Sequence, residues 1–125
     1  MPRTTIPAAS IVTPVGPYPT LQPAADSLTP TWQAADVANG NQFALGTGKY
    51  DIHARNVHAS IDYTVTLTSS ADERKRTGDI TTYNVDFGKQ MIFRVDQQAG
   101  WVQSDGMFYL SGSNAAVEFL IVRLP

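Results

Sequence analysis

The chain has 125 residues, a net charge of −2 and no cysteine, and 16% of its residues are charged, where roughly 25% is usual. The length fits one domain, and the slight negative charge excludes a basic surface for nucleic acid or an anionic membrane. The lack of cysteine excludes disulfides and thiolate metal sites. We therefore expect neither nucleic acid nor a membrane among its partners, and so few charges hint that part of the surface is buried against another protein.

Residues 1–30 are rich in proline and poor in charge. Proline fixes φ and lacks an amide hydrogen, so this stretch can form neither a regular helix nor a central strand. We predict an extended N-terminal arm over residues 1–30. The prolines of the arm are Pro2, Pro7, Pro14, Pro17, Pro19, Pro23 and Pro30, and its only charged side chains are those of Arg3 and Asp26.

The arm should lie against a protein surface, because it also carries large apolar side chains that a solvated tail would lack. Two arrangements remain open: the arm folds back over its own domain and caps a sheet edge, or it lies on a neighbouring subunit. The prolines interrupt every candidate signal peptide, so we expect the chain in a cytosol or in a particle assembled there. The arm residues expected to bind a partner are Pro14, Pro17, Tyr18, Leu21 and Leu28.

Residues 31–125 predict a single all-β domain. Residues 60–68 alternate between apolar and polar side chains, and weaker strands are expected at 42–45 and 49–56. Residues 107–110 are expected to extend from a turn at Ser104-Asp105-Gly106. Residues 115–124 are apolar on both faces, which suits a strand buried on both sides. The strand spacing fits a compact antiparallel β-sandwich, a jelly roll or a small barrel. One helical turn is expected at residues 32–37.

A β-hairpin is predicted around Gly88, because glycine tolerates the positive φ of a tight turn. Its strands would be residues 80–87 and 90–95. The side chains expected to point inward are those of Tyr83, Val85, Phe87, Met91, Phe93 and Val95.

Residues 69–79 concentrate three carboxylates and three bases. One interpretation is a solvent-exposed loop with local ion pairs, which add little stability. The alternative is a loop that docks on a neighbouring protein. In that case Arg74, Lys75 and Arg76 would contact the partner.

No catalytic, cofactor-binding or metal site can be assigned, and we expect no enzyme. His53 and His58 would face opposite sides of one strand and could not share a metal ion. Asp51 and Arg55 flank His53 on one face, like an acid–base row, but cross-strand polar pairs explain the pattern equally well. The aromatic group Trp101, Phe108 and Tyr109 could stack on sugar rings, although such residues more often form a core or an interface.

Three segments together resemble the small virion proteins of tailed bacteriophages that are encoded near the major capsid protein. They are Thr13-Pro14-Val15-Gly16-Pro17-Tyr18-Pro19, Ala71-Asp72-Glu73-Arg74-Lys75-Arg76-Thr77-Gly78-Asp79-Ile80 and Gly100-Trp101-Val102-Gln103-Ser104-Asp105-Gly106. The resemblance implies a capsid decoration, or cement, protein. Such proteins commonly form trimers or clustered monomers at local symmetry axes, where they brace capsomers against the pressure of the packaged DNA.

The partners implied by this resemblance are the major capsid protein and further copies of the chain, with a trimer favoured. The implied location is the capsid surface of a virion assembled in the host cytoplasm. No catalytic residue comes with the family. Two alternatives remain: a head–tail joining or tail structural protein, and a carbohydrate-binding β module on a virion surface.

Overall fold

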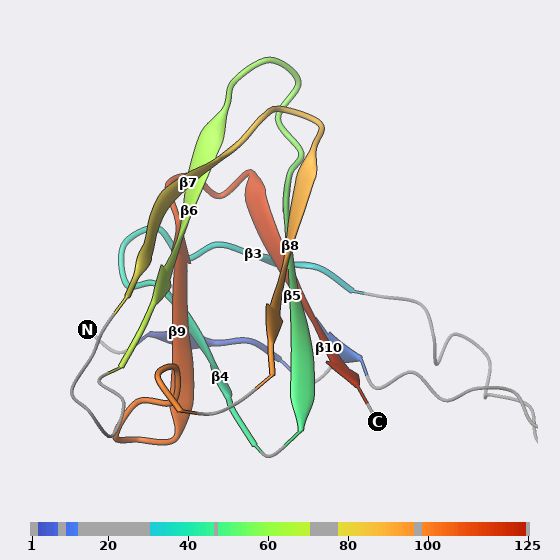
Figure 1. Ribbon diagram of the computed structural model, residues 1–125. Coiled ribbons are helices and arrows are strands. Elements are labelled where there is room, and N and C mark those ends of the chain that lie inside the picture. The colour runs from blue at the N-terminus through green and yellow to red at the C-terminus, as the bar shows by residue number, and fades with distance from the viewer. Residues whose placement is uncertain are drawn as a thin grey trace, which may run out of the picture.

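The computed structural model describes residues 3–7, 10–12, 31–46, 48–70, 78–96 and 99–124, and these form two packed β-sheets (Figure 1). The predicted all-β class is confirmed. The strands are β1 (Thr4–Thr5), β2 (Ile11–Val12), β3 (Gln33–Ala34), β4 (Asn41–Ala44), β5 (Lys49–Asn56), β6 (Tyr63–Thr68), β7 (Ile80–Val85), β8 (Gln90–Val95), β9 (Met107–Gly112) and β10 (Val117–Leu124).

The first sheet, sheet A, has the strand order β1-β4-β9-β6-β7, and the second, sheet B, has the order β2-β10-β5-β8. Strand β3 also joins sheet B, by pairing with β10. Pairing is antiparallel except where the two N-terminal strands attach, since β1 is parallel to β4 and β2 is parallel to β10. Of the predicted architectures, the molecule adopts the antiparallel β-sandwich.

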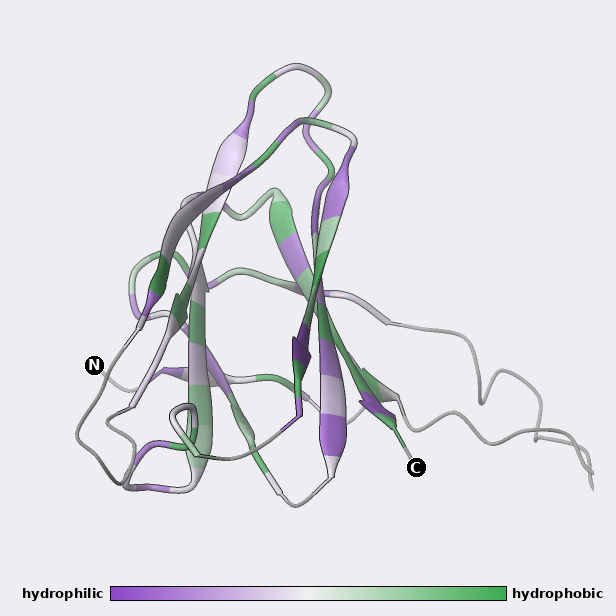
Figure 2. Cartoon of the chain, viewed as in Figure 1, coloured by the Kyte–Doolittle hydropathy of each residue, from purple (hydrophilic) through white to green (hydrophobic). Residues whose placement is uncertain are grey.

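The core lies between the sheets and follows the alternation of the strands. Every second residue of β5 is buried, from Tyr50 to Asn56, and the intervening residues face outward. Figure 2 shows the resulting bands of apolar and polar residues along the strands. Phe43, Phe108 and Phe119 are fully buried at the centre. The hydrophobic pattern thus fixes which face of each strand points inward.

Strand β10 is central in sheet B, as its two apolar faces predict. It pairs with β5 along its whole length, while β2 and β3 lie on its other edge. Val117, Phe119 and Ile121 point into the core, and Leu120 on the opposite face is also buried.

The predicted hairpin of residues 80–87 and 90–95 is wrong, although its turn exists. Strand β7 pairs with β6 in sheet A, whereas β8 pairs with β5 in sheet B. The turn at Gly88, with φ of 71°, therefore carries the chain from one sheet to the other. A local pattern of alternation and turn residues cannot tell a hairpin from such a crossing, because partner choice depends on distant strands.

The inward orientation predicted for these two strands holds only in part. Val85 and Val95 are buried, and Met91 and Phe93 pack against the core. Tyr83 and Phe87, predicted to be inward, are about half exposed. Phe87 lies in the turn beyond β7. The pairing of β6 with β7 shifts register between Val65 and Leu67, where Thr82 has φ of 50°. Such a bulge inserts an extra residue and re-aims the neighbouring side chains.

The helical turn expected at residues 32–37 is also wrong. Strand β3 occupies Gln33 and Ala34, and a turn follows at residues 37–39. Pairing with β10 supplies the backbone partners that a helical turn would otherwise provide. The Asp36 carboxylate then accepts a bond from the Asn39 amide at 3.2 Å, which favours a tight turn.

The described part of the N-terminal segment, residues 3–7 and 10–12, lies on the sandwich, and we call it the strap. The strap adds β1 to sheet A and β2 to sheet B, so it crosses from one sheet to the other (Figure 1). Ile6, between the two strands, is only 2% exposed and belongs to the core. Residues 13–30 of the predicted arm lie outside the described residues.

Candidate interaction surface

All eight residues predicted to contact a partner lie outside the described residues, so their placement remains a prediction. They are Pro14, Pro17, Tyr18, Leu21, Leu28, Arg74, Lys75 and Arg76. The structure does describe both ends of the charged segment of residues 69–79. The Asp79 carboxylate accepts bonds from the Ser69 amide (2.9 Å) and hydroxyl (2.7 Å), and the Gly78 amide donates to the same hydroxyl oxygen. The hydroxyl bond lowers the pKa of Asp79 below its usual range.

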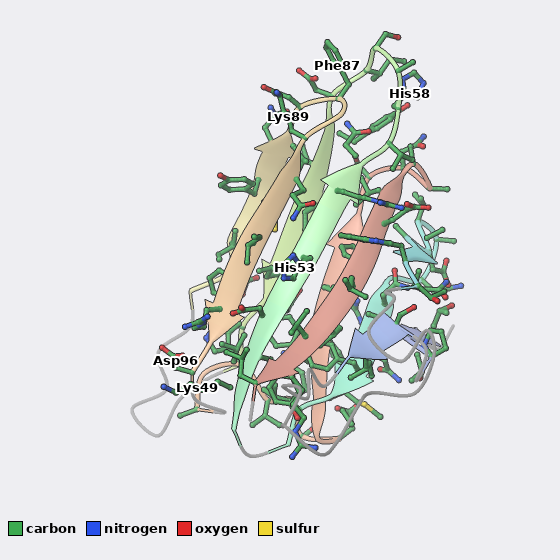
Figure 3. All side chains as sticks on the ribbon, turned by 90° about the vertical axis from the view of Figure 1, so that its right-hand side faces the viewer. Lys49, His53, His58, Phe87, Lys89 and Asp96 are labelled. Carbon is green, nitrogen blue, oxygen red and sulfur yellow. The ribbon has the colours of Figure 1, made fainter. Side chains whose placement is uncertain are left out.

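Three large apolar side chains are exposed at one end of the sandwich, and we call them the apolar tip: Val57, Ile61 and Phe87. They are 51%, 48% and 48% exposed. Val57 and Ile61 lie on the β5–β6 connection and Phe87 on the β7–β8 turn. Figure 3 shows Phe87 at this end together with Lys89 and His58, far from Lys49 and Asp96 at the opposite end. The sequence pattern did not reveal this surface, because it placed Ile61 in the alternating strand of residues 60–68 and predicted that Phe87 points inward.

Asn56 joins the two connections that carry the apolar tip. Its side-chain amide donates to the carbonyl oxygens of Ile61 at 2.8 Å and Val85 at 3.0 Å. Its backbone amide donates to the Lys89 carbonyl, and its own carbonyl accepts from the Gly88 amide. The residue is 1% exposed. A buried side chain with this many partners holds the ends of three strands in one arrangement.

Further hydrogen bonds order the tip. The Asp62 carboxylate accepts from the Phe87 amide at 3.0 Å, which links the two connections again. Nδ1 of His58 accepts from the amides of Ser60 (3.1 Å) and Ile61 (3.0 Å). The His58 ring packs edge-on against Tyr63. The exposed apolar side chains are therefore carried by backbone that is already ordered.

Two open hollows flank the β7–β8 turn. One, of about 230 Å³, runs from Tyr83 and Val85 on β7 to Met91 on β8. The other, of about 420 Å³, lies between the end of β5 and the turn, with Val57 and Lys89 on its walls. The tip is thus a projecting, half-apolar surface with shallow concavities beside it. Such a shape suits contact with a protein surface better than enclosure of a small molecule.

The acid–base row on β5 is a set of cross-strand ion pairs. Asp51 bonds to Arg94 of β8 at 2.7 Å, and Arg55 bonds to Glu118 of β10 at 2.7 Å. The Arg94 guanidinium holds the pKa of Asp51 below its usual range. His53 lies between these pairs on the outer face of sheet B (Figure 3). These contacts fit the interpretation of the row as cross-strand polar pairs.

The aromatic group near the Ser104–Gly106 turn packs with the core. Phe108 is fully buried, and Trp101 lies between Phe93 and Phe108 with ring centroids 5.3 and 5.6 Å away. The Tyr109 hydroxyl donates to Asp105 at 2.7 Å, which raises the pKa of Tyr109 and lowers that of Asp105. These contacts are those of core and turn residues.

Within the described ranges, no group of three or more histidine, aspartate or glutamate side chains is arranged to hold a metal ion. Nor does this part of the chain contain a helix long and apolar enough to cross a membrane. No known protein family, curated protein or solved structure matches the chain.

Proposed function

We propose that the chain is a structural, non-enzymatic virion protein: a capsid decoration, or cement, protein that binds the outside of a phage head and bridges its subunits. The observation that carries this proposal is the apolar tip. Fully burying a large apolar side chain contributes about 1.5–3 kcal/mol, and the three tip residues are about half exposed. Exposed apolar residues that gather in one place are typical of surfaces that contact another protein.

Order at the tip supports a docking role. Asn56 and Asp62 fix the backbone of both connections before any partner arrives. A pre-ordered surface loses less conformational entropy on binding, so more of its apolar burial appears as affinity. Many modest contacts of this kind, repeated over a shell, add by avidity.

The tip can be tested by placing carboxylates on it. The double variant Ile61→Asp/Phe87→Asp should bind phage heads at least about tenfold more weakly, since burying a charge opposes docking. Co-sedimentation with heads of the phage that encodes this chain, stripped of their own copies, measures the binding. Val37→Asp is the matched control, because Val37 is 54% exposed in the β3–β4 connection, away from the tip. Equal binding by the tip and control variants would argue against this surface.

Copy number separates decoration from head–tail joining. A decoration protein is present in hundreds of copies, whereas a joining or tail protein is present in few. Quantitative mass spectrometry of purified virions gives the ratio of this chain to the major capsid protein. A ratio that corresponds to only a few copies of this chain per virion would exclude decoration.

A further inference from the structure

The strap occupies a slot formed by the outer edges of β4 and β10. The Thr4 amide donates to the Gly40 carbonyl at 3.0 Å, and the Ile6 amide donates to the Gln42 carbonyl at 2.8 Å. At its other end, Ile11 pairs with Ile121 in parallel register. An extended segment that completes the edges of two sheets is bound as a peptide ligand would be, by strand addition.

Arg3 provides specific recognition at one end of the slot. Its guanidinium donates to the Leu110 carbonyl at 3.2 Å and to the Asn41 carbonyl at 3.4 Å, and it lies over the Tyr109 ring, 4.3 Å from the centroid. Gly40 makes room for it: a Cβ atom on Gly40 would overlap the guanidinium. The slot therefore accommodates an arginine side chain through polar and aromatic contacts at this position.

Side chains fix the register of the strap. The Thr4 hydroxyl donates to the Asp36 carboxylate at 2.5 Å, and the side-chain amide of Gln42 donates to the Thr5 hydroxyl oxygen at 3.2 Å. Ile6 then enters the core. Four consecutive side chains, from Arg3 to Ile6, thus contact the slot.

Two buried polar atoms at the strap lack hydrogen-bond partners within the described part of the chain. Ser10 Oγ on the strap and Asn41 Nδ2 on the adjoining strand β4 are both buried, and neither has a hydrogen-bond partner among the described residues. Each strap strand is only two residues long. The two unpaired polar atoms reduce the net stabilisation that the strap contributes, and short edge strands are elements where local opening occurs.

We propose that the slot binds the strap of a second copy of this chain when copies assemble. Residues 13–30 join the strap to β3 and, fully extended, would reach on the order of 50 Å, which is enough to place the strap on a neighbour. An exchanged strap makes the same contacts as its own, so exchange costs little in contact energy. The proposal does not depend on which partner the apolar tip contacts.

Cysteine pairs can trap the exchange, because the chain has no cysteine of its own. Thr5 and Gln42 are direct neighbours across β1 and β4, at a spacing that a disulfide can bridge. A full-length Thr5→Cys chain mixed with a full-length Gln42→Cys chain should form a disulfide-linked heterodimer on mild oxidation. The control partner is Asn84→Cys, which is exposed on β7 away from the slot. The proposal is overturned if Thr5→Cys forms no more heterodimer with Gln42→Cys than with Asn84→Cys.

Alanine substitutions at two glycines of the acceptor chain then test whether Arg3 directs the exchange. Gly40→Ala in the acceptor chain should lower the heterodimer yield several-fold, because the added methyl group displaces the guanidinium. Gly106→Ala is the matched control: its φ of 80° equals the 79° of Gly40 within a degree, and no atom lies near its missing side chain. Circular dichroism establishes that both acceptors are folded. Equal yields from the two acceptors overturn the role assigned to Arg3.

Discussion

Asn56 is the residue on which the end of the sandwich depends. It terminates β5, and its side chain bonds to the β5–β6 connection and to the last residue of β7. The amide of His58 donates in turn to its side-chain oxygen at 2.9 Å. Neither charge nor polarity alone distinguishes Asn56 from the solvent-facing asparagines of the chain. Its importance follows from its place on the inward face of β5, which the alternation of that strand does predict.

Replacing Asn56 with alanine should strongly reduce the free energy of unfolding. The change leaves the buried carbonyl of Val85 and the partly buried carbonyl of Ile61 without their donor, and an unsatisfied buried group costs about 1–3 kcal/mol. Urea unfolding followed by circular dichroism measures the loss. Asn84→Ala on exposed strand β7 should change stability by less than about 0.5 kcal/mol. A loss at Asn56 no greater than at Asn84 would contradict the proposed role.

The strands themselves were largely predictable, and their pairing was not. Residues 49–56 and the apolar run ending at Leu124 form the expected strands, because the alternation reports directly on burial. The turn at Gly88 was also found, yet its strands join different sheets. Partner choice depends on contacts distant in sequence, which no local pattern contains. The apolar tip could not be predicted either, because Asn56 and Asp62 join two connections that lie far apart in the sequence.

The attachment of β1 should weaken in acid. Bonds from the Thr4 hydroxyl and the Asn39 amide lower the pKa of Asp36 below its ordinary 3.8. Because the folded pKa is the lower one, this contact stabilises the fold above about pH 3.8 and is lost as the pH falls through the folded value. The difference in unfolding free energy between the wild type and Asp36→Asn should therefore shrink from pH 7 to pH 3. Asp96→Asn, at an exposed carboxyl after β8, controls for the loss of one charge; a difference independent of pH would contradict the expectation.

At the scale of the whole molecule, the strap is part of the sandwich, whereas residues 13–30 are predicted to contact a partner. The strap supplies Ile6 to the core and an edge strand to each sheet, so removing residues 1–28 would also remove part of the sandwich. The proline pattern left two arrangements of the arm open. The strap adopts one of them, because it folds back over its own domain. Composition could not distinguish the arrangements, because an apolar segment packs equally well on its own subunit or on another. A test of the predicted arm must therefore leave the strap in place.

Replacing residues 13–30 with a glycine–serine linker of equal length makes that test. The described strands and core residues lie outside this range, so the variant should remain folded, with cooperative urea unfolding. If Pro14, Pro17, Tyr18, Leu21 and Leu28 contact neighbouring subunits, binding to phage heads should fall as these apolar contacts disappear. Ile6→Ala is the contrasting variant: it leaves residues 13–30 intact but should lower the unfolding free energy by about 2–5 kcal/mol, because it opens a cavity in the core. Undiminished head binding by the linker variant would contradict the arm prediction and leave the apolar tip as the docking surface.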